Sequence, residues 1–527
     1  MFLIMSAAYI DIELQSEFGS IPPSLLPLGN RRLFQHQNAI IPPDVKKFIS
    51  IPDTYQLSEM DTAWLHINNF TILLIPDSLS LGASLIAALS LIDDYLTTPI
   101  HILFGDTLLN QLPLGNNIVT LAEVEDSYNW ATINSSPNSK WLSSSTNNLT
   151  SNNQVVCGYF KFNQPRQLIR CITQSHWDFI DGLNRYHDLI GLQTTTIKNW
   201  LDFGHVNTYY RSKAKFTTQR AFNELIITPE WVEKSSAKNK KIKAEANWFT
   251  ELPAEMRNYI PQFMGSTEEN GRFKYKLEYL HHTALNELYV FSKLPSIVWK
   301  NIFNSCFGFI SCCQNSPAKN DSNYSNLEQL FGEKTIIRLN IFCKERNIHL
   351  DDKWIIDGQE VSLNDILKIA SQWLPTKKIL PTVMHGDFCF SNILYDFRAN
   401  RIKTIDPRGL THNEDLTIYG DIRYDIAKLS HSVLGMYDWI IAGYYDVDLR
   451  NNQIHLTIAG QQEKQDIQHL FIDIIKEKFQ LSPMNLFAMQ IHLFLSMLPL
   501  HDDDKNRQDA LFANAFRLYL VLKGYIQ

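Results

Sequence analysis

The 527-residue sequence is poor in three features that would each point to a particular class of protein. Its seven cysteines are scattered, without the paired spacing of a zinc site or a disulfide framework, which predicts free thiols in a cytoplasmic protein. The net charge of −7 gives no general attraction to nucleic acid. The longest apolar stretch that we identify, 79–92, is too short to span a bilayer. We therefore expect neither nucleic-acid binding nor membrane insertion.

Strand and helix patterns alternate in the first part of the chain, up to about residue 215. The apolar opening at 1–10 predicts a buried first strand, because acidic residues follow it at once and it lacks the basic start of a signal peptide. Further strands are predicted at 70–76 and 101–106, with a helix at 80–95 between them. This alternation predicts an α/β domain over 1–215 with a mostly parallel sheet.

The order changes after residue 215, where strands come first and helices later. Strands at 221–227 and 231–234 and a helix at 241–252 predict a small lobe over 216–285. The remainder, 286–527, is mostly helical and predicts a second, larger lobe. Helices predicted within it include 425–445 and 509–522. Together the two lobes predict an α+β domain.

The segment 381–396 has the residues for phosphoryl transfer from ATP. That reaction needs a carboxylate that accepts the proton of the attacking hydroxyl and oxygen ligands for Mg²⁺. Asp387 and Asn392 have the D-x-x-x-x-N spacing of a kinase catalytic loop. A β-type run then ends in Asp406, where a second Mg²⁺ ligand is expected at a strand end. We predict Asp387 as the base, with Asn392 and Asp406 on the metal.

These motifs resemble those of the aminoglycoside phosphotransferase and choline kinase superfamily. The resemblance lies in His385-Gly386-Asp387, Asn392 and Ile405-Asp406, and it covers roughly residues 217–527. It implies a protein-kinase-like fold, His385 and Asp387 in the catalytic motif, and a small hydroxylated acceptor. Asp425 looks like the aspartate that braces the catalytic loop in this superfamily.

A kinase-like small lobe needs a lysine for the ATP phosphates and a helix glutamate that holds it. We predict Lys234 and Glu245 for these roles. The lysines that compete with Lys234 are Lys238, Lys240, Lys241 and Lys243. The segment 275–280, with Glu278 and Leu280, resembles the hinge whose backbone binds adenine. The G-x-G-x-x-G motif is absent, as it often is in this superfamily.

The first domain resembles sugar-nucleotide and phosphocholine nucleotidyltransferases. The segment Leu25-Leu26-Pro27-Leu28-Gly29 through Leu33 looks like the L-L-P-x-x-G-x-x-L segment of that family, and Asp106 and Asp202 match its metal aspartates. This implies a Rossmann-like fold that binds Mg²⁺ with CTP or another nucleoside triphosphate. Alternatively, both aspartates cap turns after strands.

The phosphate-binding part of that motif departs from the family pattern. A glycine-rich, arginine-bearing loop and a lysine are replaced here by Glu13, Glu17 and Ser24. The expected cradle for a triphosphate is therefore missing from this place. Arg31 or Arg32 could supply positive charge from another position.

Three functional hypotheses follow from these patterns. The leading one is a cytoplasmic kinase of a sugar, amino alcohol or related precursor in bacterial surface-polysaccharide biosynthesis, such as capsule or lipopolysaccharide decoration. The second is a bifunctional kinase and nucleotidyltransferase that makes an NDP- or CDP-activated precursor. The third is a nucleotide-binding scaffold without turnover. Asp502 or Asp503 could hold an amino or hydroxyl group of the acceptor, or belong to a solvated acidic loop.

Overall fold

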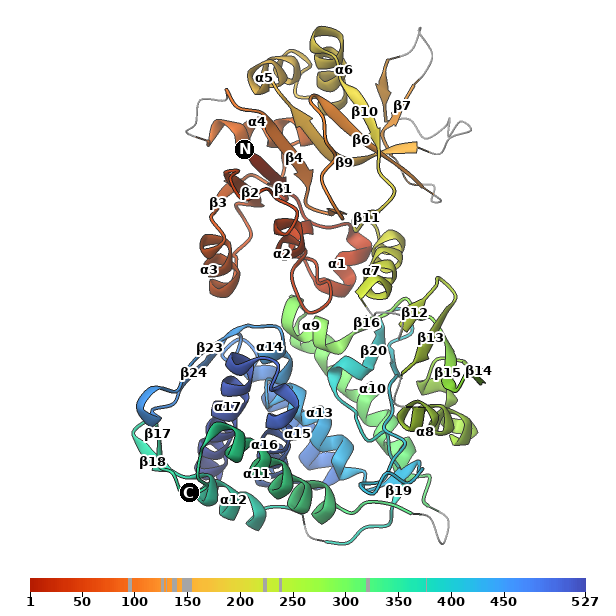
Figure 1. Ribbon diagram of the computed structural model, residues 1–527, viewed down its shortest axis with the longest axis vertical. Coiled ribbons are helices and arrows are strands. Elements are labelled where there is room, and N and C mark those ends of the chain that lie inside the picture. The colour runs from red at the N-terminus through yellow and green to blue at the C-terminus, as the bar shows by residue number, and fades with distance from the viewer. Residues whose placement is uncertain are drawn as a thin grey trace. The chain divides into compact units, whose positions relative to one another are not determined.

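The computed structural model divides into two compact units, Met1–Thr217 and Thr218–Gln527, and each is described by itself (Figure 1). The structure describes residues 1–92, 97–124, 128, 130–134, 140–144, 154–220, 225–236, 239–318, 323–375 and 377–527, with the side chains of 218–220 left out.

A seven-stranded sheet forms the centre of unit 1, in the order β10-β6-β9-β4-β1-β2-β3. Its strands are β1 (Phe2–Met5), β2 (Lys47–Pro52), β3 (Phe70–Ile75), β4 (Ile100–Phe104), β6 (Ile118–Glu123), β9 (Gln154–Phe162) and β10 (Gln193–Thr196). The β1–β2, β2–β3, β1–β4 and β6–β10 pairs are parallel. Only β9 runs antiparallel to its neighbours, β4 and β6. The prediction of a mostly parallel sheet is confirmed.

Helices cover both faces of this sheet. Successive side chains of β1 therefore point alternately into two hydrophobic cores, one on each face. Leu3 and Met5 belong to the core under α4, α5 and α6, whereas Phe2 and Ile4 belong to the core under α2 and α3. The helices are α1 (Ile12–Phe18), α2 (Leu33–Asn38), α3 (Glu59–Ile67), α4 (Leu81–Ser90), α5 (Pro165–Gln174), α6 (Phe179–Ile190) and α7 (Val206–Arg220). Ser80 caps α4, and residues 93–96 of the predicted helix lie outside the described residues. Short strand pairs are β5 (Thr107–Leu109) with β11 (Trp200–Asp202), and β7 (Thr132–Ile133) with β8 (Leu142–Ser143).

Unit 2 begins with a four-stranded antiparallel sheet in the order β12-β13-β15-β14. Its strands are β12 (Leu225–Ile227), β13 (Trp231–Ser235), β14 (Phe263–Glu269) and β15 (Arg272–Glu278), and α8 (Asn239–Glu251) packs on them. The strand predicted at 231–234 and the helix predicted at 241–252 are confirmed. Residues 221–224 of the other predicted strand lie outside the described residues.

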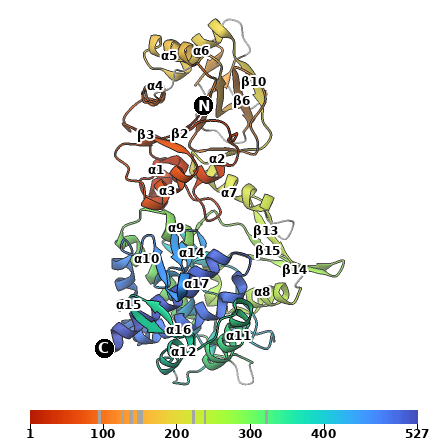
Figure 2. The same ribbon diagram turned by 60° about the vertical axis from the view of Figure 1, so that its left-hand side comes forward.

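The rest of unit 2 is mainly helical (Figure 2). The helices are α9 (Leu285–Phe291), α10 (Ser296–Gln314), α11 (Lys334–Arg346), α12 (Leu363–Gln372), α13 (Arg423–Val433), α14 (Tyr437–Ile441), α15 (Gln465–Phe479), α16 (Pro483–Met497) and α17 (Lys505–Ile526). Short strands join them: β16 (Thr283–Ala284), β17 (Trp354–Ile356), β18 (Gln359–Val361), β19 (Thr382–Val383), β20 (Ile393–Asp396), β21 (Arg401–Thr404), β22 (Tyr419–Gly420), β23 (Tyr445–Asp448) and β24 (His455–Ile458).

The prediction of one helix over 425–445 is wrong. The chain ends α13 at Val433 and turns before α14, with Met436 in the left-handed region at φ 56°. A Cβ on Gly435 would lie 2.6 Å from the ring of Phe494, so the turn approaches α16 as closely as glycine allows. Tyr445 already begins β23.

Among the residues that the structure describes, the helical stretch Pro483–His501 is apolar and longer than the apolar helix Leu81–Ser90, which falls within 79–92. It has the length and composition of a membrane span, by those two criteria alone. However, 72% of it is buried inside unit 2, where α16 contacts α11, α12 and α17. This burial is typical of a core helix.

Candidate active sites

The loop between β19 and β20 holds Asp387 with both carboxylate oxygens in contact. Its Oδ1 lies 2.8 Å from Nζ of Lys428 on α13. The side-chain amide of Asn392 donates to Oδ2 over 3.2 Å and to the Asp387 carbonyl over 2.9 Å. Oδ1 therefore faces the cation of Lys428, whereas Oδ2 faces the side-chain amide of Asn392, which we predict as a metal ligand.

Burial alone would raise the pKa of Asp387, but Lys428 outweighs it and the pKa falls to about 2. Asp387 is therefore an anion at neutral pH. Lys428 was not predicted from the sequence. The sequence feature that could have identified Lys428 is its position three residues after Asp425, which places both side chains on one face of α13.

Asp425 braces the same loop through backbone hydrogen bonds. Its carboxylate accepts the N–H groups of His385 over 2.7 Å and Gly386 over 2.8 Å. Gly386 has φ 79°, and a Cβ there would lie 2.7 Å from Cβ of Arg408, so this turn requires glycine. Burial raises the pKa of Asp425 to about 7.

His385 is fully buried, and its ring packs against Trp248 of α8 and Phe309 of α10. Its Nδ1 accepts the N–H of Asp387 over 3.3 Å. Burial lowers the pKa of His385 to about 4, so the ring is neutral at physiological pH. These contacts suit a residue that positions Asp387.

Lys234 contacts both Glu245, 11 residues further on, and Asp406, which is distant in the sequence. Nζ of Lys234 lies 2.8 Å from Oε2 of Glu245 on α8 and 2.9 Å from Oδ1 of Asp406. The Tyr275 hydroxyl donates to the same Glu245 oxygen over 2.7 Å. Although burial opposes it, the two carboxylates raise the pKa of Lys234.

The competing lysines are engaged elsewhere or farther from Glu245. Lys240 pairs with Glu414, and Lys243 with Glu268. Lys241 is exposed and lies 3.8 Å from Glu245. Lys238 lies outside the described residues.

Asn392 and Asp406 offer the kind of ligand that Mg²⁺ prefers. The Ile405 N–H donates to the Asn392 carbonyl over 3.0 Å, which ties the two residues to neighbouring positions. Their side chains present amide and carboxylate oxygens, and phosphate oxygens and water normally complete such a site. The described residues contain no cluster of three or more His, Cys, Asp or Glu side chains that could hold a metal alone. The donor set fits a metal shared with a nucleotide.

The predicted hinge, 275–280, comprises the end of β15 and the two residues after it. Glu278 is exposed, and its Oε2 accepts the Gln262 N–H over 3.2 Å. Leu280 is half-buried, and its carbonyl accepts the His282 N–H over 2.9 Å. Glu278 ends β15, and Leu280 lies between β15 and β16.

Asp503 is exposed and lies 2.6 Å from the guanidinium of Arg507 on α17. Asp502 is also exposed. A solvated acidic loop describes this segment better than an acceptor site.

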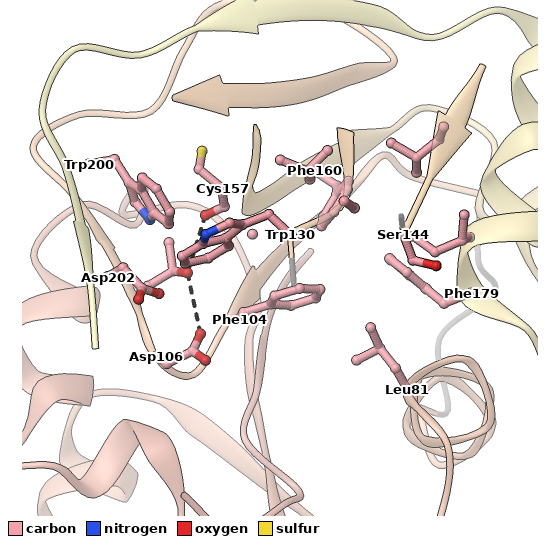
Figure 3. Close-up of a pocket in the computed structure, with 16 residues that line it drawn as sticks. Leu81, Phe104, Asp106, Trp130, Ser144, Cys157, Phe160, Phe179, Trp200 and Asp202 are labelled. Carbon is pink, nitrogen blue, oxygen red and sulfur yellow. Dashed lines mark hydrogen bonds between the residues drawn. The ribbon is translucent and has the colours of Figure 1, made fainter. Parts of the chain in front are cut away.

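In unit 1, Asp106 and Asp202 line one cavity of about 250 Å³ (Figure 3). Asp106 lies in the turn between β4 and β5, and Asp202 ends β11, which pairs with β5. A Cβ on Gly204 would lie 2.8 Å from Oδ2 of Asp106 and 3.5 Å from Oδ1 of Asp202, so both carboxylates converge there. Burial raises the pKa of Asp106. Much of the remaining wall is aromatic: Phe104, Trp130, Phe160, Phe179 and Trp200.

Several residues near the expected phosphate-binding loop contact other parts of unit 1. Glu13 and Glu17 belong to α1, and Glu17 accepts a hydrogen bond from Tyr210. The buried Ser24 hydroxyl donates to Ser6 over 2.7 Å. Arg32 is buried and pairs with Asp61 over 3.4 Å, whereas Arg31 is exposed.

No family model matches the chain, and no curated protein is significantly similar to it. Solved structures with some likeness include a nucleoside-diphosphate-sugar pyrophosphorylase from Vibrio cholerae RC9, at 13% identity and TM-score 0.34 over 40% of this chain and 99% of that one. An inositol-1-phosphate CTP transferase from T. maritima has 11% identity and TM-score 0.32 over 41% of this chain and 96% of that one. An aminoglycoside-3'-phosphotransferase of type VIII has 12% identity and TM-score 0.32 over 55% of this chain and 99% of that one. These values are too low to assign a family or an activity.

Proposed function

We propose that unit 2 is an ATP- and Mg²⁺-dependent phosphotransferase that acts on a hydroxyl group of a small acceptor. The observation that carries this proposal is the contact of Lys234 with both Glu245 and Asp406, beside the Asp387–Asn392 pair. If Asp406 merely capped a turn, it would not need the half-buried Lys234 from a distant strand. Phosphoryl transfer needs this set of groups.

Each residue has a role in this proposal. Asp387, an anion at neutral pH, orients the acceptor hydroxyl and takes its proton. Lys234 binds phosphate oxygens, held in place by Glu245. Asn392 and Asp406 would hold Mg²⁺, which neutralises negative charge on the phosphates when it is bound.

Asp406→Ala is expected to remove the thermal stabilisation that ATP and Mg²⁺ give to the wild-type protein. A ligand at 100 times its Kd stabilises by about 2.7 kcal/mol, which is readily measured by differential scanning fluorimetry. Asp446→Ala, at an exposed position on β23, is the matched control and should keep the shift. A wild-type protein that ATP does not stabilise would contradict the proposed function.

A second candidate activity is nucleotidyl transfer in unit 1, favoured by the convergence of Asp106 and Asp202. We expect wild-type protein to release pyrophosphate from CTP or another nucleoside triphosphate when a phosphorylated acceptor is added. Asp106→Ala should reduce this rate by about 100-fold or more, since metal-bound carboxylates position the phosphates. If Asp106→Ala releases pyrophosphate as fast as the wild type, this site does not catalyse nucleotidyl transfer.

Both activities together would suit the activation of a sugar or amino alcohol for a glycan in the cytoplasm. One unit would phosphorylate the alcohol, and the other would couple the phosphate to a nucleotide. An acceptor screen followed by ³¹P NMR tests this. Binding of ATP without any phosphoryl transfer or hydrolysis would instead favour a nucleotide-binding scaffold.

A further inference from the structure

Four basic side chains interact electrostatically with Tyr424 of α13, and we name Lys334, Arg338, Arg408 and Lys428 the cationic cluster. Lys334 and Arg338 are four residues apart on α11, so they lie on one helix face. Tyr424 and Lys428 have the same spacing on α13. Arg408 follows β21, and its N–H donates to the His385 carbonyl over 2.8 Å.

Direct contacts join Lys334 to Tyr424 and Lys428 to Asp387. Nζ of Lys334 lies 3.4 Å from the Tyr424 hydroxyl and 5.8 Å from its ring centroid. Lys428 reaches Asp387 over 2.8 Å. Arg338 donates to the Ser496 carbonyl over 3.3 Å. Two helices and the segment after β21 therefore direct positive charge toward the catalytic loop.

Most of this charge lacks a counter-ion. Among the residues that the structure describes, only Lys428 of the cluster forms an ion pair with a carboxylate. Lys334 and Arg338 are half-buried, so water screens their charges only in part. Tyr424 raises the pKa of Lys334, but burial and the neighbouring cations outweigh it and lower the pKa. Burial raises the pKa of Tyr424, but the cluster outweighs it and lowers the pKa to about 8. Uncompensated, half-buried cations are typical of a site for an anion.

The two oxygens of the Asp387 carboxylate contact different groups. Oδ2 contacts Asn392, whereas Oδ1 contacts Lys428. The nucleotide phosphates are assigned to Lys234 on the small sheet, which already has two carboxylate neighbours. The positive charge of α11 and α13 is thus better placed to bind the phosphate acceptor than the nucleotide.

We propose that the phosphate acceptor itself carries a phosphate or carboxylate group, which Lys334, Arg338 and Arg408 bind while its hydroxyl reaches Asp387. This inference rests on the proposed phosphotransferase function. In the reaction the hydroxyl oxygen bonds to the γ-phosphorus, the bond from that phosphorus to the β,γ-bridging oxygen breaks, ADP leaves, and the hydroxyl proton passes to Asp387.

Matched acceptor pairs test the predicted charge. Glycerol is compared with glycerol 3-phosphate, ribitol with ribitol 5-phosphate, and glucose with glucuronic acid, by ATP-dependent product formation. We expect kcat/KM at least about tenfold higher for the charged member, and the phosphorylated and carboxylated pairs show which anion is preferred. Preference for neutral or cationic acceptors would overturn the inference.

Lys334→Gln and Arg338→Gln should each raise the acceptor KM by about tenfold or more, with the ATP KM changed much less. Lys344→Gln, at an exposed position on the same helix, is the matched control. A larger rise in the ATP KM than in the acceptor KM would assign the cluster to the nucleotide and overturn the inference.

A binding measurement keeps the inference testable if none of these acceptors is phosphorylated. The wild-type protein, saturated with ADP and Mg²⁺, is acetylated with a lysine-reactive ester while inorganic phosphate is titrated, and peptides are quantified by mass spectrometry. Phosphate should slow the labelling of Lys334 but not of Lys344. Unchanged labelling of Lys334 would overturn the inference. Failure of ATP to bind at all would instead refute the proposed function.

Discussion

Asp387→Asn should lower kcat/KM for phosphoryl transfer by about 10²–10⁴-fold, the usual contribution of a general base. The asparagine keeps the size of the side chain and its contact with Asn392, but it cannot take a proton. ATP binding should therefore persist, which fluorimetry can verify. Activity is measured as ADP release with any acceptor found in the screen. Undiminished transfer would exclude Asp387 as the base.

The pH dependence of the rate separates this role from a purely structural one. Because the pKa of Asp387 is about 2, wild-type activity should show no acid limb from this group above pH 4 or so. Lys428→Met removes the cation that lowers this pKa but leaves the burial that raises it. An acid limb should then appear at higher pH in the variant. Asp446→Asn, on the exposed part of β23, should leave the profile unchanged.

Sequence reasoning succeeded where local patterns carry the information. Short β-type runs predicted β1, β3 and β4, and the D-x-x-x-x-N spacing identified Asp387 and Asn392. The pairing of Lys234 with Glu245 was also predicted, because the strand and the helix that carry them are adjacent in the sequence.

The features that were missed depend on contacts between distant segments. The break after α13 follows from the close approach of Gly435 to Phe494, which periodicity within one helix does not reveal. Lys334 and Tyr424 meet although 90 residues separate them, so the cationic cluster had no signature in one stretch of sequence. The sequence left open whether Asp502 or Asp503 contacts the acceptor or belongs to a solvated acidic loop, and the Asp503 carboxylate is paired with Arg507.

Asp425→Ala should loosen the catalytic loop, because it leaves the buried N–H groups of His385 and Gly386 without their acceptor. Each such group costs about 1–3 kcal/mol. We expect faster hydrogen–deuterium exchange in the peptide around 382–392 and lower stability of unit 2. Asp425→Asn keeps one acceptor oxygen and should fall between the wild type and Asp425→Ala. Equal exchange in all three proteins would contradict the bracing role.

The pH dependence of stability gives this prediction a second, independent readout. Burial raises the pKa of Asp425 to about 7, so the folded protein holds this proton at pH values where the unfolded chain has lost it. The stability that this group contributes is therefore fully present below its unfolded pKa near 4 and is lost as pH rises through about 7. Asp425→Asn cannot titrate, so the free energy of unfolding should fall less steeply with pH than in the wild type. The difference between the two curves, measured in urea from acid to neutral pH, isolates this carboxyl from the other titrating groups. A curve parallel to that of the wild type would show that Asp425 keeps an ordinary pKa.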